Sequence, residues 1–451
     1  MTALTEHAAM LRERIINKQA QIAVIGCGYV GLPLAVRLAE TGFRVAGIDL
    51  DEQRVRTLRD GRSPIMDVSQ ERLEEQLESG RFRASSDYDE LREADVIFVT
   101  VPTPFDRAKQ PDLRFVVAAA EGIASRLRTR QLVILESTTF PGTTDEVMRP
   151  ILERGGLKAG ADFYLAFSPE RIDPGNREFG IHNTPKVVGG VDEQSAELAG
   201  LVLEQIVESG KIHLVSSARV AEMTKLLENT FRAVNIALVN ELAMLCDRMD
   251  INVWEVIEAA ATKPYGFMPF YPGPGVGGHC IPVDPYYLAW KAREFDFQTR
   301  FIELAAETNQ TMPFFAVTRI RRLLNHAGSS VHGAQILVLG AAFKKDIDDP
   351  RNSPAVRVME ILRSEGAHVQ YHDALVPEVT LADTLFAKNG LGTRMRSVDL
   401  NPNVVAGADC VVILVGHSRV DYDMVLAKAR LVFDCVNVTS GRQGRAVVER
   451  L

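Results

Sequence analysis

Cysteine is scarce in this chain, and no two cysteines stand at the spacing of a zinc knuckle or a redox pair. The five cysteines (27, 246, 280, 410 and 435) are scattered over 451 residues without a CxxC motif. An odd, dispersed set is not typical of a disulfide framework or a zinc site. We therefore expect no bound metal and a reducing compartment, the cytoplasm.

Long apolar runs and excess positive charge are missing too. No window approaches the roughly 18 uninterrupted apolar residues of a membrane-spanning helix. The N-terminal stretch mixes charges throughout, which predicts no secretory signal. The net charge of −8 argues against a nucleic-acid surface, and 451 residues are too many for one core. We expect two or three domains, no membrane contact and no nucleic-acid partner.

The first informative stretch is a glycine-rich turn between a strand and a helix. An apolar run at 22–25 meets Gly26, Gly28 and Gly31, and a second strand (43–48) ends at Asp49. This context predicts a dinucleotide site: the glycines allow the turn and a close approach of the pyrophosphate, which lies at the helix N-terminus. Asp49 would accept hydrogen bonds from the adenosine ribose and favours NAD over NADP. Arg54 nearby leaves that choice open.

The alternation of strands and helices then continues, and polar turns follow the strands at 96–100, 132–135 and 163–167. Ligands bind beyond the carboxyl ends of parallel strands. Thr103, Thr138 and Glu170 are thus candidates for the cofactor and substrate crevice, although Ser and Thr at such turns equally cap helices.

From about residue 219 a helical pattern runs for some thirty residues without Gly or Pro. Lys225 and Asn229 are four positions apart and share one face of this helix. Taken alone, they are more simply read as an exposed polar face. The apolar residues at 233–245 are consistent with a long helix that joins domains or forms a homodimer.

The loop at 273–285, GPGVGGHCIPVDP, surrounds one cysteine, Cys280, with glycine and proline. Such a composition predicts an ordered loop of unusual backbone shape. A lone cysteine in a cytosolic protein is more often a small buried hydrophobe. The other motifs of this chain favour a functional thiol instead.

A second strand–turn–helix layout begins at 334 and reaches a strand ending in Asp373, followed by strands at 410–415 and 431–435. It lacks GxGxxG and carries AAFKK at 341–345. Lys344, Lys345 and Arg351 indicate a different phosphorylated ligand or, equally, solvated surface charge.

Together these stretches resemble the UDP-glucose/GDP-mannose dehydrogenase family over essentially the whole chain. The resemblance rests on GCGYVGLPLA (26–35), VPTP (101–104), STT (137–139), SPE (168–170), AEMTKLLENTFRAVNIALVNE (221–241), GPGVGGHCIPVDP (273–285) and AAFKKDIDDPRNSP (341–354). It implies an α/β fold in which two Rossmann-like parallel-sheet domains are joined by a central helical domain. The implied boundaries are 1–210 for NAD binding, 211–328 for the helical dimerisation and catalytic domain, and 329–451 for the UDP-sugar.

The resemblance also implies a twofold oxidation of the C6 alcohol of a UDP-sugar to a carboxylate. An aldehyde can donate a second hydride only after a nucleophile has made it tetrahedral, which is what a thiolate does. Cys280 is the implied nucleophile, and Lys225 and Asn229 stabilise the oxyanion.

Three further residues receive implied catalytic roles. Asp284, with a water held near Lys225 and Thr138, supports proton removal from the alcohol. Glu170 activates the water that hydrolyses the thioester.

The implied binding residues fall into two sets. Those for NAD are Gly26, Gly28, Tyr29, Val30, Gly31, Asp49, Arg54, Thr103, Thr138 and Arg351. Those for the UDP-sugar are Glu170, Arg171, Lys225, Asn229, Gly277, Gly278, Phe343 and Lys344.

Several alternatives remain open. The loop GGHCIPVDP favours UDP-N-acetylglucosamine over UDP-glucose, because the glucose branch has Ser in place of His279; UDP-N-acetylmannosamine enzymes share the GGHC sequence. An inactive NAD-binding scaffold would have lost the thiol or the Lys/Asn pair. A two-electron 3-hydroxyacid dehydrogenase would need neither the thiol loop nor a third domain.

Overall fold

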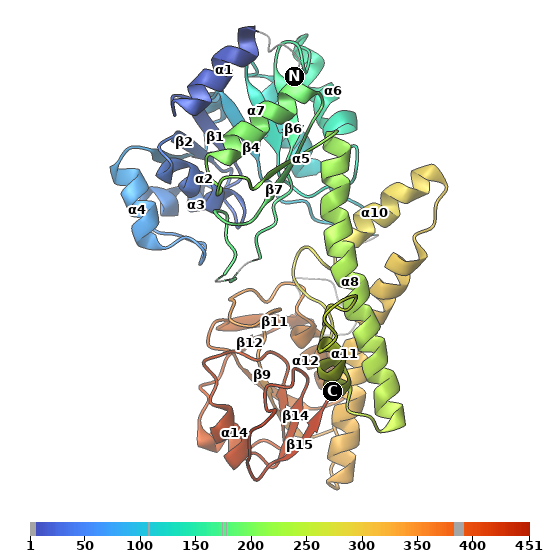
Figure 1. The fold of residues 1–451 in the computed structure, drawn as a ribbon. Helices are drawn as coiled ribbons and strands as arrows, with labels where there is room; N and C mark the ends of the chain where they lie inside the picture. Colours follow the sequence, from blue (N-terminus) through green and yellow to red (C-terminus); the bar gives the residue numbers. More distant parts are fainter. Residues whose placement is uncertain (1–5, 107–108, 174, 177, 383–391) are drawn as a thin grey trace. The chain divides into compact units, whose positions relative to one another are not determined.

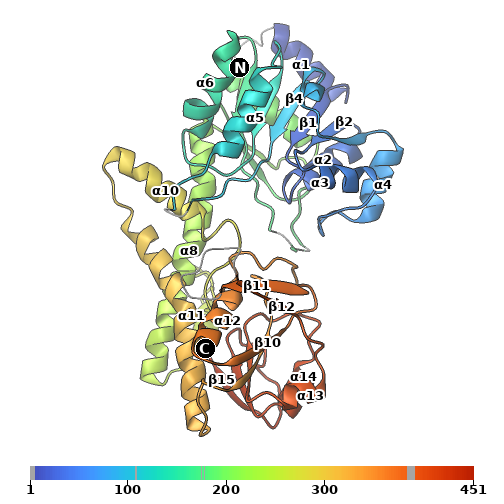
Figure 2. The ribbon, with the colours of Figure 1, turned by 180° about the vertical axis from the view of Figure 1, so that it is seen from behind.

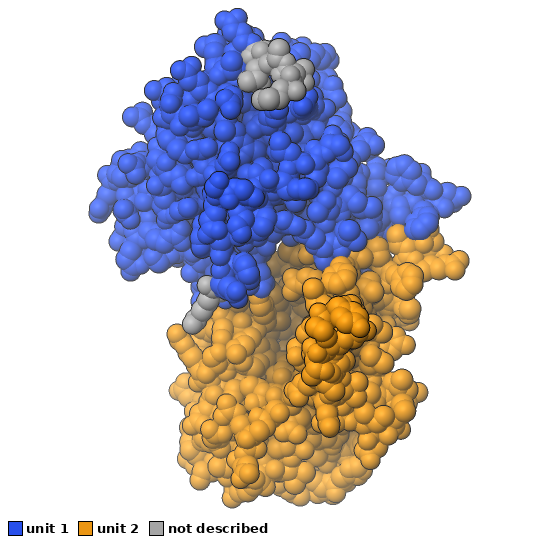
Figure 3. Space-filling model, viewed as in Figure 1, with its two compact units in different colours: residues 1–228, 286–297 blue, residues 229–285, 298–451 orange. Residues whose placement is uncertain are grey.

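The computed structural model describes residues 6–106, 109–173, 175–176, 178–382 and 392–451. The chain forms two compact units (Figure 3): unit 1 comprises Met1–Glu228 and Tyr286–Phe297, and unit 2 comprises Asn229–Pro285 and Gln298–Leu451. Part of the polar turn predicted after the strand at 163–167 lies outside the described residues. The domain boundaries expected at 210 and 328 stay a prediction.

Unit 1 is built on an eight-stranded sheet of order β3-β2-β1-β4-β5-β6-β7-β8. Its strands are β1 (Gln21–Ile25), β2 (Arg44–Ile48), β3 (Phe82–Ser85), β4 (Val96–Val99), β5 (Leu132–Leu135), β6 (Tyr164–Phe167), β7 (Lys186–Gly190) and β8 (Ile212–Val215). The first six are parallel; the sequence predicted all of them except β3. The last two were not predicted: β7 runs antiparallel to β6, with β8 parallel to β7. The sheet is therefore mixed.

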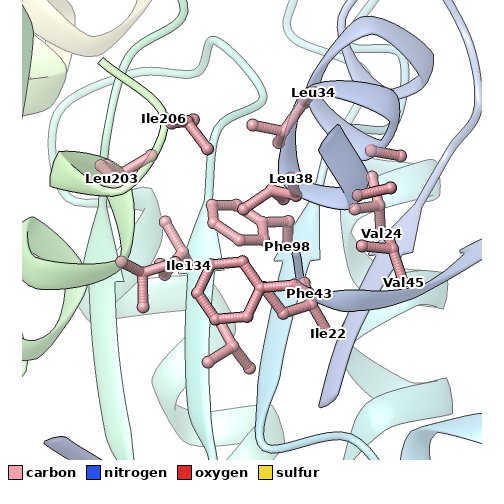
Figure 4. Close-up of a cluster of buried hydrophobic side chains, with 14 of the residues drawn as sticks. Ile22, Val24, Leu34, Leu38, Phe43, Val45, Phe98, Ile134, Leu203 and Ile206 are labelled. Atoms are coloured by element: carbon pink, nitrogen blue, oxygen red, sulfur yellow. The ribbon is translucent and has the colours of Figure 1, made fainter. Parts of the chain in front are cut away.

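Helices cover both faces of this sheet, which Figures 1 and 2 show from opposite sides. They are α1 (Glu6–Ile16), α2 (Gly31–Glu40), α3 (Glu52–Arg59), α4 (Gln70–Glu78), α5 (Arg114–Ala124), α6 (Arg149–Leu152) and α7 (Glu193–Glu204). Alternate residues of each strand face opposite cores, so Ile22 and Val24 pack with Leu34 and Leu203 (Figure 4), while Ile25 belongs to the other core.

The chain crosses between the two units within a helical part of the sequence. Its helices are α8 (Ala218–Met249), α9 (Val253–Ala261), α10 (Asp284–Ala292) and α11 (Arg300–His326). The predicted long helix is confirmed as α8, with 32 residues. The chain passes from unit 1 into unit 2 within α8, and it returns and leaves again around α10.

Unit 2 also contains the second sheet, of order β10-β9-β13-β14-β15. Its strands are β9 (Gln335–Leu339), β10 (His368–His372), β13 (Cys410–Ile413), β14 (Leu431–Asp434) and β15 (Val447–Arg450), all parallel. The helices α12 (Pro354–Ser364), α13 (Pro402–Ala406) and α14 (Tyr422–Lys428) accompany it, with a hairpin of β11 (Glu378–Ala382) and β12 (Gly392–Arg396). The predicted strands β9, β10, β13 and β14 are confirmed; β15 and the hairpin were not predicted.

Candidate active site

The glycine turn after β1 has the shape that a dinucleotide site requires. Gly26 adopts a φ of +96°, and a Cβ on Gly31 would lie 1.8 Å from the Gly26 carbonyl oxygen. Both positions therefore admit only glycine. By contrast, a Cβ on Gly28 would meet no atom within 4 Å, so the backbone there is open to an approaching ligand. Val30 is the N-cap of α2, and the exposed Tyr29 stands beside it.

The carboxylate of Asp49 lies at the end of β2, where the ribose of a dinucleotide would lie. Asp49 Oδ2 accepts hydrogen bonds from the backbone N of Cys27 (2.9 Å) and from Arg54 Nη1 (3.0 Å). These bonds fix the carboxylate against the glycine turn. The tight turn, the open Gly28 and the anchored Asp49 fit an NAD molecule.

The turns after β4 and β5 place the two threonines predicted for this crevice. The carbonyl oxygen of Thr103 accepts a hydrogen bond from the Tyr287 hydroxyl. Thr138 is partly exposed, next to Ser137, whose hydroxyl donates to the Val101 carbonyl at 2.8 Å. Thr138 thus keeps its side chain at the surface of the turn, while its neighbour holds the turn to the end of β4.

Glu170, just after β6, is buried and tightly held. Its Oε1 accepts from the backbone N of Arg171 (2.6 Å) and of Ile172 (2.8 Å), and its Oε2 accepts from Lys186 Nζ at 2.5 Å. Burial alone raises the pKa of Glu170, yet the charge and hydrogen bond of Lys186 and the two N–H groups bring it below its ordinary value. The carboxylate is therefore held ionised.

Lys225 lies beside Glu170 in unit 1. Its Nζ donates to the carbonyl oxygen of Glu170 at 2.6 Å. One turn earlier on α8, Glu222 accepts from the backbone N of Gly142 (2.5 Å) and from the backbone N (2.9 Å) and hydroxyl (2.7 Å) of Thr144. This buried carboxylate fastens α8 to the turn that carries Thr138. Burial raises the pKa of Glu222 to about 7, against those hydrogen bonds.

The side chain of Arg171 is held in place by an ion pair and a hydrogen bond. Its guanidinium pairs with Glu228 of α8 and donates to the carbonyl oxygen of Pro185 at 2.9 Å. The side chain predicted to contact substrate therefore also fixes the turn after β6 to α8 within unit 1.

In unit 2, Cys280 is exposed, whereas the other four cysteines are buried. The carbonyl oxygen of Cys280 accepts from the backbone N of Val283 (3.0 Å) and of Asp284 (2.8 Å), and this turn leads into α10. Asn229 Nδ2 donates to Asp284 Oδ2 at 2.5 Å, and both side chains are buried. The structure thus joins the predicted Asn229 and Asp284, and Asp284 stands four residues after the thiol.

The loop that carries Cys280 packs against the turn after β9. A Cβ on Gly277 would lie 2.7 Å from Phe343 Cβ, and one on Gly278 would lie 2.8 Å from the Phe343 ring. Asn352 Nδ2 donates to the Gly278 carbonyl at 3.1 Å. The predicted substrate residues Gly277, Gly278 and Phe343 are therefore in contact, and partly buried Lys344 follows Phe343.

Asp349 connects the same turn to the residue before the thiol. His279 Nε2 lies 2.8 Å from Asp349 Oδ2, and Arg351 donates to Asp349 from Nε (2.9 Å) and Nη2 (2.8 Å). Despite burial, these bonds hold the pKa of Asp349 well below its ordinary value. A contact of Arg351 with NAD stays a prediction.

The predicted residues therefore form two sets. Lys225, Glu170 and Arg171 lie together in unit 1; Cys280, Asn229, Asp284, Phe343 and Arg351 lie in unit 2. Sequence reasoning missed Lys186, Glu136, Glu222 and Asp349. Asp349 and Glu222 stood inside motifs already singled out, at 341–354 and 221–241.

At the turn after β9, a side-chain carboxylate accepts hydrogen bonds from two backbone N–H groups. Asp373 Oδ2 accepts from the backbone N of Ala341 (2.8 Å) and Ala342 (3.0 Å) and pairs with His417 Nε2 at 3.1 Å. A side-chain carboxylate therefore takes N–H groups that a phosphate would otherwise reach. The ligand expected at this turn stays a prediction.

Comparison with known proteins covers all of these parts. Three models of the UDP-glucose/GDP-mannose dehydrogenase family match: the NAD binding domain at residues 20–207, the central domain at 219–311 and the UDP binding domain at 337–441. No helix in the described part of the chain is long and apolar enough to cross a membrane.

Individual relatives are similar over most of their length. The UDP-N-acetyl-D-glucosamine 6-dehydrogenase of Pseudomonas aeruginosa is 39% identical over 80% of this chain and 84% of its own. The UDP-N-acetyl-D-mannosamine dehydrogenase of Pyrococcus horikoshii is 38% identical over 88% and 89%. A solved structure of the UDP-D-ManNAc dehydrogenase from that organism superimposes with a TM-score of 0.85 at 34% identity, covering 95% of this chain and 98% of that one. The chain belongs to the UDP-glucose/GDP-mannose dehydrogenase family and is an NAD-dependent UDP-sugar dehydrogenase.

Proposed function

We propose that this enzyme oxidises the C6 alcohol of UDP-N-acetylglucosamine twice, to the uronic acid, in the cytoplasm and through a covalent intermediate on Cys280. The observation that carries the proposal is the state of this thiol. Among five cysteines it alone is exposed, and its loop is braced by Phe343 and Asn352. A structural cysteine would be expected to be buried.

The residues of unit 1 hold the cofactor and the hydrolytic base. Gly26, Gly28, Gly31 and Asp49 bind NAD, which when bound accepts a hydride from the sugar carbon in each oxidation. Tyr29, Val30, Arg54, Thr103 and Thr138 line the same site, and Arg351 is a further proposed NAD-binding residue.

In the first oxidation Asp284, positioned by Asn229, takes the alcohol proton through a water held by Lys225 and Thr138. The thiolate of Cys280 then adds to the aldehyde carbon. The oxyanion that forms is stabilised by the charge of Lys225 and by hydrogen bonds from Asn229. In this mechanism the charge of Lys225 would also favour the thiolate form of Cys280.

After the second oxidation the acyl group is held on Cys280 as a thioester. Glu170, ionised because of Lys186, removes a proton from water, whose oxygen bonds to the acyl carbon as the carbon–sulfur bond breaks. The UDP-sugar is held by Gly277, Gly278, Phe343 and Lys344, with Arg171 at the turn after β6.

The covalent route is tested by stoichiometry and by substitution. We expect the enzyme to form two NADH per sugar, and Cys280→Ser to bind NAD normally without forming acid. Glu170→Gln should accumulate the acyl adduct, visible as added mass on Cys280. A Cys280→Ser variant that still forms two NADH per sugar would rule out the route.

The choice of sugar is a separate proposal. The sequence GGHCIPVDP and the similarity to UDP-N-acetyl-D-glucosamine 6-dehydrogenases at 39% and 35% identity support UDP-N-acetylglucosamine. A relative at 38% identity acts on UDP-N-acetyl-D-mannosamine by its name. Steady-state kcat/KM on UDP-N-acetylglucosamine, UDP-N-acetylmannosamine and UDP-glucose decides between them, and we expect the first to be highest.

We also propose that two copies pair through α8. Its exposed large apolar residues, Val220, Met223, Leu227, Phe231, Leu238, Leu242, Leu245 and Met249, follow the three-and-four spacing of one helix face. Light scattering should show a dimer for the wild type and a monomer for Leu238→Gln/Leu245→Gln. Leu50→Gln, which changes an exposed leucine elsewhere, should remain dimeric.

A further inference from the structure

A buried trio of charged side chains lies at the ends of three strands in unit 1. Lys186 Nζ is 2.5 Å from Glu170 Oε2 and 3.5 Å from Glu136 Oε1, and the side chains of Lys186 and Glu136 are fully buried. Only Glu170 has a role in the proposed mechanism. Buried charges are costly unless they are paired, so this arrangement needs a reason.

The direction of β7 explains how the trio assembles. The antiparallel register pairs Ala166 with Gly190 and Phe167 with Gly189. Continuing that register three positions along each strand sets Glu170 opposite Lys186. An antiparallel strand therefore enters the sheet at the edge where the parallel strands end, and it delivers a lysine there. Glu136 follows directly after β5, the neighbour of β6.

The two carboxylates are held very differently. Glu170 accepts three hydrogen bonds, including the one from Lys186. Neither carboxylate oxygen of Glu136 has a hydrogen-bond partner among the described residues. The hydroxyls of Ser168 and Thr139, in the turns after β6 and β5, are likewise buried without a partner in the described part of the chain. Packing alone would not call for a carboxylate at position 136.

The charges of the trio depend on one another. Burial alone would lower the pKa of Lys186, but the charges of Glu136 and Glu170 raise it. Burial raises the pKa of Glu136 to about 7, and the charge of Glu170 adds to that rise while Lys186 opposes it. Near neutral pH Glu136 therefore changes charge, whereas Glu170 stays ionised.

We propose that Lys186 and Glu136 are positioning residues for thioester hydrolysis: Lys186 fixes and ionises the Glu170 carboxylate, and Glu136 sets how strongly Lys186 holds it. The inference rests on the proposed function of Glu170. In the step itself, water loses a proton to Glu170, its oxygen bonds to the acyl carbon, and the Cys280 thiolate leaves.

The direction of the pH effect follows because Glu136 and Glu170 compete for the ammonium group of Lys186. When Glu136 is protonated, Lys186 pairs with Glu170 alone, and the carboxylate is a weak base. When Glu136 ionises, it draws on the same charge, and Glu170 becomes a stronger base. The other charged groups at Glu170 and its turn are Lys225, whose Nζ donates to the Glu170 carbonyl oxygen, and Arg171, whose guanidinium pairs with Glu228.

The first experiment separates acylation from hydrolysis. With UDP-N-acetylglucosamine, or the best of the three nucleotide sugars, and excess NAD, Lys186→Met should give a rapid burst of two NADH per site. Turnover should then be about 100-fold slower than in the wild type, at the lower end of what a general base contributes. Intact mass should show the acyl adduct on Cys280, and Lys186→Arg should restore much of the rate.

The second experiment uses a variant that keeps shape and removes one charge. Glu136→Gln makes position 136 neutral at every pH. In the wild type the rate of decay of the acyl adduct should rise as the pH passes about 7. In the variant this rise should be absent, and the rate should stay at the value that the wild type has at low pH. Glu222→Gln is the matched control: this glutamate is also buried, and its pKa is also raised to about 7, but it contacts Gly142 and Thr144 and not Lys186. Its profile should keep the rise.

Each outcome decides the proposal. Burst and adduct in Lys186→Met support it, and a first turnover slowed as much as later ones overturns it, because the lysine would then serve the fold alone. If Lys186→Met does not fold, the Glu136→Gln profile decides: a lost rise supports the proposal, and a retained rise overturns it. Failure of the proposed function looks different, since wild-type enzyme would form one NADH per sugar or Glu170→Gln would accumulate no acyl adduct on Cys280.

Discussion

His279 Nε2 lies 2.8 Å from Asp349 Oδ2, so the residue before the thiol is held by the turn that carries Phe343 and Arg351. Asp349 is itself fixed by hydrogen bonds from the guanidinium and the backbone N of Arg351. The loop of Cys280 and the predicted sugar-binding turn therefore form one hydrogen-bonded assembly within unit 2. A change that displaces Asp349 or Arg351 should therefore also displace the loop that carries Cys280.

Asp349→Asn should loosen the thiol loop without removing any proposed catalytic group. The neutral amide loses the charge that pairs with Arg351 and His279. Because a small displacement of reacting groups is costly, kcat should fall by about 10- to 100-fold. Iodoacetamide labelling of Cys280 should change in rate. Asp348→Asn, at the exposed neighbouring position, should behave as wild type.

Gly277→Ala tests the contact between the loop and Phe343. The new Cβ would lie 2.7 Å from Phe343 Cβ and 2.8 Å from the carbonyl oxygen of Asn352, and the backbone atom cannot move away cheaply. Overpacking of this kind costs about 1–3 kcal/mol of unfolding free energy. Thermal unfolding measures the loss. Gly273→Ala, where a Cβ would meet nothing within 4 Å, is the control and should leave stability unchanged.

Asn229→Asp should convert a donor into a second carboxylate beside Asp284. Asn229 Nδ2 donates to Asp284 Oδ2 at 2.5 Å, and two buried carboxylates at that distance share one proton. At neutral pH the first oxidation should slow by about 100-fold, because a stabilising donor is lost as well. Activity should recover partly as the pH rises. Asn235→Asp, on the same helix with its amide bonded to Phe231 O, should show no such pH dependence.

Much of the fold was predictable because local patterns decide it. Apolar runs followed by polar turns identified β1, β4, β5 and β6, and the absence of Gly and Pro identified α8. The strands β7 and β8 escaped because β7 begins with a lysine and ends in glycine, and β8 is only partly buried. Their direction depends on pairing across the sheet, which no local pattern encodes.

The candidate site likewise contains residues that local sequence predicts and residues that it does not. Cys280, the glycine turn and Phe343 stand in distinctive local sequences, so they could be named in advance. Lys186 is an ordinary lysine between Pro185 and Val187, and it reaches Glu170 only because β7 runs antiparallel. Partners that depend on strand direction could not be predicted from spacing.

Unit 2 should lose stability in acid partly through Asp373. Burial alone would raise the pKa of Asp373, but His417 and the N–H of Ala341 lower it to about 2. Because the folded pKa is below the unfolded value, this carboxylate stabilises the fold above about pH 4, and the contribution is lost as the pH falls towards 2.

Asp373→Asn should therefore flatten the dependence of unfolding free energy on pH between about 2 and 4. The chain has two tryptophans, of which Trp254 lies in unit 2 and Trp290 in unit 1. In a Trp290→Phe background, Trp254 fluorescence during urea unfolding reports on unit 2 alone. If the Asp373→Asn variant loses stability in acid as steeply as its parent, other carboxylates carry the effect.

The pairing of Arg54 with Asp49 predicts how cofactor choice can be changed. Arg54 Nη1 donates to Asp49 Oδ2 at 3.0 Å, so its charge is directed at the carboxylate that would face the ribose. The 2′-phosphate of NADP would meet that negative charge, and such like-charge contacts cost several kcal/mol. Asp49→Ser removes the repulsion and frees Arg54 to bind the phosphate. The ratio of kcat/KM for NADP to that for NAD should rise by at least about tenfold, and Asp49→Ser/Arg54→Ala should lose the gain. An unchanged ratio in the single variant would mean that another group excludes the phosphate.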